Sequence, residues 1–474
     1  MTICGAIVAT FGLWFAVATI IARLPQLSRT SILNRVALSL STSWALVGFG
    51  IMVLGWLHFF YAVVFFTIGL VAGALSAVIW VRTLARRGPL HWRRTTRDFS
   101  RSDFAVAVVG LLAVASAALG AVRQPLSGDE KGYKWVAPLA WSHAHHFIEV
   151  TFRLSNGFNL AEYLSVPAAT FHALVVARFV EVAMLVGIGL AAAALADAAG
   201  VRRGWWVGIA AVSIPLAVID ATWVGSDLEP AAFLAAATLA FMILPGYSRM
   251  VFYCVLTAGA VQAKVIVAPV AVVMTLVLVL LFDNARGRVA LRHTVAYSIG
   301  TVGSLIIGFT HTLVLTGHLV ANNVRSVFPS GSYAVATGEA AGRTPNLFDI
   351  LLLPINPFIV GIIGQREPYG GRTGLAMLVG LPVVVVLIYR DRDLRSRMFG
   401  FFVLGALTYL VIAPVFIKTR FLLVSWVFFL VAIGLAGEEL AHQNSRLRRI
   451  GLWAVPGILL VSVLDPVRVL ARLA

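Results

Sequence analysis

Apolar runs long enough to cross a lipid bilayer dominate this sequence, and short polar loops separate them. Hydrophobic residues make up 60% of the 474 residues and charged residues 12%, which is more apolar surface than a soluble core can bury. Within a bilayer the backbone has to satisfy its own hydrogen bonds, and a helix does so within a single run. We therefore predict an all-α polytopic membrane protein.

We expect about fourteen transmembrane helices (about thirteen to fifteen), because a run of roughly 20 apolar residues spans the hydrocarbon core. The predicted spans lie near 3–22, 36–56, 58–81, 104–122, 171–195, 204–222, 229–245, 250–264, 266–282, 294–316, 374–389, 398–416, 421–437 and 450–470.

The distribution of arginine predicts which loops face the cytoplasm. The densest basic loop lies at 82–101, and positive charge marks cytoplasmic loops. Counting outwards from it places both termini outside and the basic stretches near 202–203, 286–292, 390–397 and 446–449 inside. This holds if 347–363 does not cross the membrane. Two prolines and an asparagine interrupt that segment, so we predict a re-entrant or interfacial segment on the outer side.

The formal net charge of +17 does not indicate a nucleic-acid partner. Most of the positive charge is arginine in loops between apolar runs, where it can meet anionic lipid headgroups. Membrane lipids are therefore the predicted partners of this charge.

Two adjacent acids, Asp129 and Glu130, closely follow the uncharged run Phe104–Val122, where the chain is expected to leave the lipid. A carboxylate in that place can accept the proton of a hydroxyl group and make its oxygen nucleophilic. The alternative is an interfacial ion pair with Lys131 or Lys134. We predict that this pair forms a reaction site at the outer surface.

Several cations near outer helix ends could bind a phosphate carried on a lipid. Four of them lie in or beside the first outer loop: Lys131, Lys134, Arg153 and Arg178. Ordinary phospholipid headgroups are their alternative ligands. Lys264 lies between two apolar runs and Arg420 just inside the outer end of a late span, so both need an anion and are candidate phosphate ligands.

Two further polar groups have a simpler alternative. Asp227 and Glu229 mark a second outer turn, and acids are also common at the start of a helix that has proline in its first turn.

The histidines at positions 143, 145 and 146 precede Glu149, but on a helix they do not share one face as a complete ligand set. We therefore predict no metal site there.

The order of these residues resembles glycosyltransferases of the C fold (GT-C), especially the branch of protein O-mannosyltransferases and the lipid A aminoarabinose transferase. Asp129–Lys134 is similar to the first-loop motif of that branch, an acid followed four residues later by Tyr-His; Tyr133 matches and Lys134 replaces the histidine. Further similar segments are Asn159–Glu162 (Asn-Gly-Glu), Ser226–Pro230 (Asp-Leu-Pro-Leu-Ala), Gln262–Lys264, Thr316–His318 (Thr-Gly-Asn-Pro, without its proline) and Arg420–Leu423 (Arg-Tyr-Leu-Leu-Pro).

This resemblance implies inverting transfer of a sugar from a polyprenyl monophosphate at the outer face of the bacterial plasma membrane. Asp129, with Glu130, would be catalytic, and the substrate-binding residues would be Lys131, Tyr133, Lys134, Asn159, Glu162, Asp227, Lys264 and Arg420. The acceptor would be an envelope glycan, a lipid or a protein. A divalent metal could assist, since this class includes enzymes that use a metal and enzymes that do not. Lys134 stands where the motif has histidine, so the identity of the donor sugar stays open.

The resemblance also implies four regions. They are an added N-terminal transmembrane unit with a basic loop (1–102), a GT-C-like core (103–317) containing the outer loop 123–170, an outer region (318–372), and C-terminal helices (373–474).

Two other functions fit a polytopic protein that handles lipid-linked sugars. A flippase or carrier usually has ionisable groups in the middle of the membrane and interrupted helices at corresponding positions of its internal repeats. Here such groups cluster at helix ends, with Glu181 and Asp220 among the few exceptions. A glycan polymer ligase would differ in using a donor with two phosphates instead of one.

Overall fold

The computed structural model describes residues 2–87, 100–123, 125, 130–150, 157–283, 285–318, 374–390, 397–412 and 422–473. Every regular element in these ranges is a helix, which confirms the predicted all-α class. The N-terminal helices are α1 (Thr2–Ile7), η1 (Val8–Gly12), α2 (Leu13–Ile21), α3 (Pro25–Ser28), α4 (Ile32–Trp56), α5 (Ala62–Arg87) and α6 (Arg101–Arg123).

The central elements are η3 (Glu130–Lys134), α7 (Val136–Ala144), α8 (Leu160–Ala169), α9 (Leu174–Ala199), α10 (Gly204–Val212), α11 (Pro215–Asp220), α12 (Leu228–Ile243), α13 (Gly246–Ala263), η5 (Val265–Val267), α14 (Ala268–Val277), η6 (Leu278–Phe282) and α15 (Gly287–Thr316). The last four helices are α19 (Leu375–Arg390), α20 (Arg397–Ile412), α21 (Leu423–Gln443) and α22 (Ser445–Leu473).

Nine helical segments in the described part of the chain are long and apolar enough to cross a membrane. They are Thr2–Ile21, Ile32–Trp56, Ala62–Arg82, Arg101–Arg123, Leu174–Ala199, Val265–Phe282, Gly287–Thr316, Leu423–Gln443 and Ser445–Leu464. Three shorter apolar helices, α12, α19 and α20, accompany them. These helices support a multi-pass membrane protein, while the total of about fourteen spans stays a prediction.

The predicted span 204–222 is divided into α10 and α11 instead of forming one helix. Pro215 begins α11, and the residue before it, Ile214, has an extended backbone with φ −60° and ψ 118°. Proline lacks an N–H group and disfavours helical geometry in the preceding residue. The interruption therefore follows from the sequence at this point.

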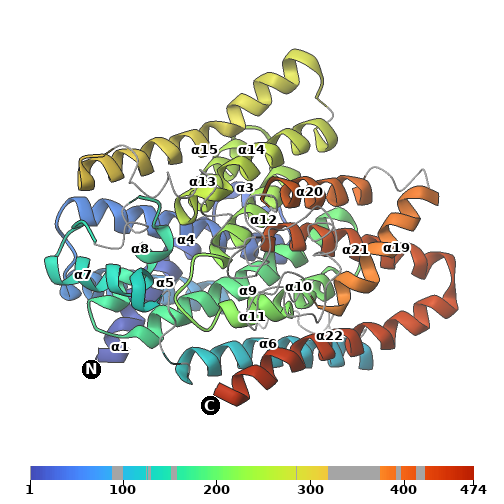
Figure 1. The fold of residues 1–474 in the computed structure, drawn as a ribbon, viewed down its shortest axis with the longest axis horizontal. Helices are drawn as coiled ribbons and strands as arrows, with labels where there is room; N and C mark the ends of the chain where they lie inside the picture. The colour runs from blue at the N-terminus through green and yellow to red at the C-terminus, as the bar shows by residue number, and fades with distance from the viewer. Residues whose placement is uncertain are drawn as a thin grey trace, which may run out of the picture.

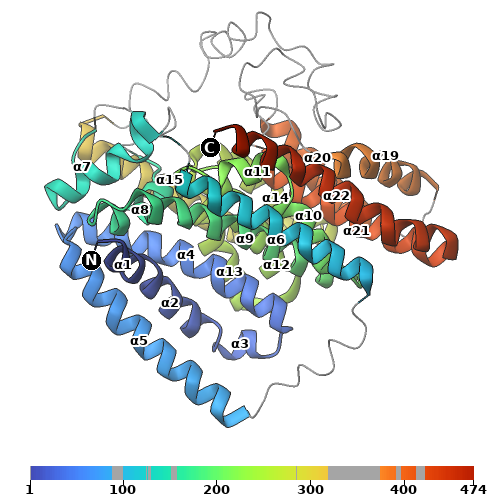
Figure 2. The same cartoon turned by 90° about the horizontal axis from the view of Figure 1, so that it is seen from below.

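Helix α9 occupies the centre of the bundle and packs against α4, α6, α8, α10, α12 and α21. Helices α6 and α22 lie side by side along one face (Figures 1 and 2). Helix α5 lies at the edge in Figure 2, where it packs mainly on η1 and α2. Many of its large side chains are exposed, as expected of a helix that faces lipid.

Close contact between glycines joins α5 to the N-terminal helix. A Cβ atom added at Gly69 of α5 would lie 2.3 Å from the carbonyl oxygen of Val8, and one added at Gly12 would lie 2.3 Å from that of Gly69. Only glycine fits such an approach of two backbones, which is a common way for helices to pack in membranes.

The first outer loop, predicted as 123–170, contains the short helices α7 and α8, which pack on each other at one end of the bundle (left in Figure 1). The aromatic residues interleaved with polar groups in this loop predict short helices that lie in the membrane interface. Every residue of α8 is instead buried, because α4, α9 and α13 also pack around it. Helix α8 is therefore part of the protein core.

Contacts between helix ends agree with the predicted alternation of direction. Three contacts join ends predicted to be outside: Trp56–His311, Arg178–Ala121 and Lys264–Asp227. Three others join ends predicted to be inside: Arg203–Asp103, Arg249–Asp283 and Arg397–Ala199. We call these two regions of the bundle the outer end and the inner end. The predicted region 318–372 and the segment 347–363 fall outside the described residues.

Candidate functional site

The predicted site residues divide into three groups. Asp129 and Arg420 lie outside the described residues, and of Tyr133 only the backbone, in η3, is described. Lys131 is exposed at the surface. The remaining predicted residues are buried or nearly buried and form ion pairs or polar contacts at the outer end: Glu130, Lys134, Asn159, Glu162, Asp227 and Lys264.

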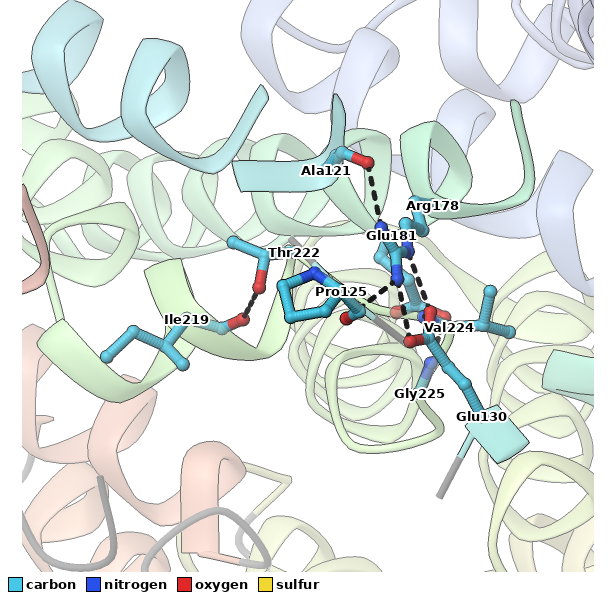
Figure 3. Close-up of polar contacts among 9 residues, drawn as sticks. All are labelled: Ala121, Pro125, Glu130, Arg178, Glu181, Ile219, Thr222, Val224 and Gly225. Atoms are coloured by element: carbon cyan, nitrogen blue, oxygen red, sulfur yellow. Dashed lines mark hydrogen bonds and ion pairs between the residues drawn. The ribbon is translucent and has the colours of Figure 1, made fainter. Parts of the chain in front are cut away.

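Glu130 forms a buried ion pair with Arg178, which lies near the start of α9 (Figure 3). Arg178 donates from Nε to Glu130 Oε1 at 2.7 Å and from Nη2 to Oε2 at 2.8 Å. The backbone N–H of Val224 donates to the same Oε1 at 3.0 Å. Glu130 is 0% exposed, and its ion pair with Arg178 balances its charge.

Arg178 is consequently directed at a protein carboxylate. It is 2% exposed, and its remaining donors bond the carbonyl oxygens of Ala121 and Pro125 at 3.2 and 3.3 Å. A planar guanidinium fits this arrangement because its donors point in fixed directions. The candidate phosphate role of Arg178 therefore has no support from this geometry.

Lys134 and Glu162 form a second buried ion pair. The Lys134 Nζ atom lies 2.5 Å from Glu162 Oε1, and the two side chains are 8% and 1% exposed. Among the described residues, Glu162 Oε2 has no hydrogen-bond partner. The pair joins the two ends of the outer loop, since Lys134 ends η3 and Glu162 lies in the first turn of α8.

Two further carboxyl groups, Glu181 and Glu229, lie next to this pair. They are close enough to interact with each other, and the charge of Lys134 acts on both. Glu181 also accepts a hydrogen bond from the backbone N–H of Gly225 at 3.0 Å (Figure 3). Adjacent buried carboxylates repel, so they need a shared proton or a nearby cation.

The sequence predictions did not include Glu181 or Glu229 among the site residues. An acid inside an apolar run is expensive unless it is used or paired, and Glu181 inside the run 171–195 carries that signal. For Glu229 the sequence indicates a second outer turn shared with Asp227, or simply an acid at the start of a helix. Its position beside Glu181 depends on the packing of α9 against α12, which no local pattern shows.

Asp227 and Lys264 form the third ion pair of the outer end. Asp227 precedes α12, and Lys264 lies at the break between α13 and η5, where its backbone is extended. Their side chains are 8% and 18% exposed, so this pair is more accessible than the other two. The sequence predicted both residues for the site, and the structure places them in direct contact.

Asn159 is buried and occupies the position before the first residue of α8, three residues before Glu162. Tyr163 follows Glu162 and is also fully buried. Burial raises the pKa of the Tyr163 phenol, and the negative charge of Glu162 raises it further. Tyr163 therefore stays protonated and packs near the ring of His311.

His311 is a buried polar residue that the sequence did not single out. The indole N–H of Trp56 donates to His311 Nδ1 at 2.7 Å, and the rings of Phe147 and Tyr163 pack around it. This bond places the proton of the neutral imidazole on Nε2. Helices α4 and α15 are joined there, far apart in sequence, and so the contact could not be read from a local motif.

The histidines at 143, 145 and 146 make aromatic contacts. His145 stacks on Tyr61 with ring centroids 4.1 Å apart, and His146 stacks on His58 at 4.4 Å. Within the described ranges, no group of three or more His, Cys, Asp or Glu side chains could hold a metal ion.

The described part of the outer end thus gathers three ion pairs and one pair of carboxyl groups, carried by η3, α8, α9, the start of α12 and the end of α13. Such an arrangement can fix the position of Glu130, and it can hold or exchange a proton. Comparison with protein-family models, with curated proteins and with solved structures finds no match for this chain.

Proposed function

We propose that this protein is a membrane glycosyltransferase of GT-C type. It transfers a sugar from a polyprenyl monophosphate to a lipid, glycan or protein acceptor at the outer face of the bacterial plasma membrane, with inversion. The observation that carries the proposal is the meeting of Glu130, Lys134, Glu162, Asp227 and Lys264 at one end of an apolar helix bundle.

In this proposal Asp129 is the general base. It accepts the proton of the acceptor hydroxyl as the oxygen attacks the anomeric carbon and the bond to the phosphate oxygen breaks. Glu130 is less suited to this step, because Arg178 and a backbone N–H occupy its oxygens. The role of base therefore falls to the acid one residue earlier.

The departing polyprenyl phosphate gains negative charge, so nearby cations favour its departure. Lys131 is exposed and carries its charge at the surface. Lys264 is partly exposed beside Asp227 and can shift between that carboxylate and a phosphate oxygen. Arg420 completes the proposed set. Lys134 is engaged with Glu162, so we assign it to holding the loop and the sugar instead of the phosphate.

A flippase or carrier of lipid-linked sugars is the second candidate. Two observations favour it: the buried carboxyl groups Glu181 and Glu229 in apolar helices, and the break between α10 and α11. Buried acids and interrupted helices are common in ion-coupled transporters. Glu181, however, accepts a hydrogen bond from the backbone N–H of Gly225, which gives this carboxyl group a structural role.

The deciding experiment measures sugar transfer in detergent, where a carrier has no compartments to connect. Purified protein is given a panel of radiolabelled polyprenyl-phosphate sugars with membrane extract as the source of acceptor. We expect the wild type to form labelled product and Asp129→Asn to lose activity by about 100-fold or more, as for loss of a general base.

The matched control is Asp197→Asn, which changes an exposed acid near the inner end of α9 and should keep full activity. Full activity of Asp129→Asn, with normal insertion, would remove Asp129 as the base. Absence of product with every donor, together with donor movement across reconstituted vesicles, would favour the carrier.

A further inference from the structure

Arg178 makes polar contacts with three points on one short stretch of chain. It bonds the carbonyl oxygen of Ala121 in the last turn of α6, that of Pro125, and both carboxylate oxygens of Glu130. These points lie before and after residues 126–129 (Figure 3). One buried side chain thus holds both flanks of the segment that contains the proposed base.

The same contacts continue to a second loop. Glu130 Oε1 accepts the backbone N–H of Val224, and the next residue, Gly225, donates its N–H to Glu181 Oε1 at 3.0 Å. Glu181 lies three residues after Arg178 on α9, almost one turn along the same face. Two successive turns of α9 therefore hold Pro125 and Glu130 on one side and the turn at 222–227 on the other. That turn also carries Asp227, the partner of Lys264.

Stability alone gives little reason to bury this ion pair. Taking an arginine and a glutamate out of water costs as much as their attraction returns, and apolar side chains of similar size often stabilise a protein more. The fork of the guanidinium instead defines direction, because two parallel bonds fix the carboxylate in one orientation. A buried, bidentate pair that bonds three chain segments is suited to setting their relative position.

We propose that Arg178 is a positioning residue for the sugar transfer described above. It fixes the position of Glu130, and of the residues that flank the Asp129 segment, relative to the 222–227 turn. The inference rests on the proposed function. Arg178 bonds the chain at Ala121, Pro125 and Glu130, and in this inference it acts on the transfer through Glu130. A lysine in its place would keep the charge but lose the two-pronged geometry.

The test separates position from stability. Arg178→Gln leaves the Glu130 charge buried without its partner, so both stability and transfer should fall. Arg178→Gln with Glu130→Gln removes both charges, and we expect the melting temperature to recover towards that of the wild type. The kcat of sugar transfer should nevertheless stay about 10- to 100-fold below the wild type, with a nearly unchanged KM for the donor, because a misplaced group lowers the rate of the chemical step.

Arg178→Lys should show the same loss of kcat with a smaller loss of stability. The control pair is Arg249→Gln with Asp283→Asn, which removes an arginine–acid pair at the inner end (2.9 Å) and should leave kcat unchanged. Recovery of kcat together with stability in the Arg178/Glu130 double variant would overturn the inference, since a purely structural pair predicts that result.

A second measurement does not depend on transfer. In a Cys4→Ser, Cys254→Ala background, Lys131→Cys presents a thiol one residue after Glu130. Its rate of reaction with a maleimide in detergent should change several-fold when Arg178 and Glu130 are both replaced by glutamine. An unchanged rate would overturn the positioning role. If the wild type transfers no sugar, the proposed function fails, and this labelling rate still decides whether Arg178 holds the loop.

Discussion

Replacing Lys134 should destabilise the outer end more than replacing its partner. Lys134→Met leaves Glu162, Glu181 and Glu229 buried without the cation whose charge acts on all three. Removing one member of a buried ion pair costs about 3–5 kcal/mol, because the other charge stays uncompensated. Glu162→Gln should cost less, since Lys134 keeps two neighbouring carboxyl groups.

The double variant Lys134→Met, Glu162→Gln should be more stable than Lys134→Met alone, because it removes the carboxylate that the lysine had neutralised. The geometry therefore predicts an order of stability in which the lysine variant is lowest, the double variant is higher and the wild type is highest. If the losses of stability in the two single variants simply added, the double variant would instead be the least stable of all.

The assay is the loss of the monodisperse size-exclusion peak of detergent-solubilised protein after heating. All variants are heated for the same time at each temperature, because the midpoint of irreversible unfolding depends on the heating rate. Lys131→Met is the control, since Lys131 is exposed three residues away and its loss should change stability by less than about 0.5 kcal/mol. A Lys134→Met protein as stable as this control, or a double variant below both single variants, would refute the reasoning.

Three other predictions concern the scaffold, and the same heating assay measures each of them. Gly69→Val should cost about 1–3 kcal/mol or detach α5, because its Cβ would meet a carbonyl oxygen at 2.3 Å, whereas Gly50→Ala, with nothing within 4 Å, should not destabilise. His145 has a φ of 62°, so His145→Gly should be about 1 kcal/mol more stable than His145→Ala, and equal stability would contradict the strain. Trp56→Phe should cost about 1–3 kcal/mol by removing the N–H that bonds His311, and a neutral result would argue against that bond.

The apolar runs determined the secondary structure. Lipid leaves no partner for an open backbone, so runs such as those that form α4, α9 and α15 have to be helical wherever they fall in the chain. Within the described residues, Pro215 interrupts the predicted span 204–222, and its effect on the preceding residue is local. Helix ends were predictable for the same reason, to within several residues.

The sequence indicated several of the charged residues that gather at the outer end, but not which of them form pairs. Acids and cations near helix ends indicated Glu130, Lys134, Asp227 and Lys264, because charge is expensive next to lipid unless it has a use or a partner. Which charge meets which depends on how α9 packs against α6, α8 and α12. Lys134, for example, forms its ion pair with Glu162, which is 28 residues away in the sequence.

The sequence by itself determined that this chain is a bundle of apolar helices whose charged residues collect at the helix ends. Hydropathy acts on each run separately, so no knowledge of neighbours is needed. Only the tertiary structure decided that Arg178 forms an ion pair with Glu130, that Glu181 lies beside Glu229, and that α8 is buried. Side-chain contacts between distant segments follow from the packing of the whole bundle, because each buried charge must find a partner wherever the helices bring one.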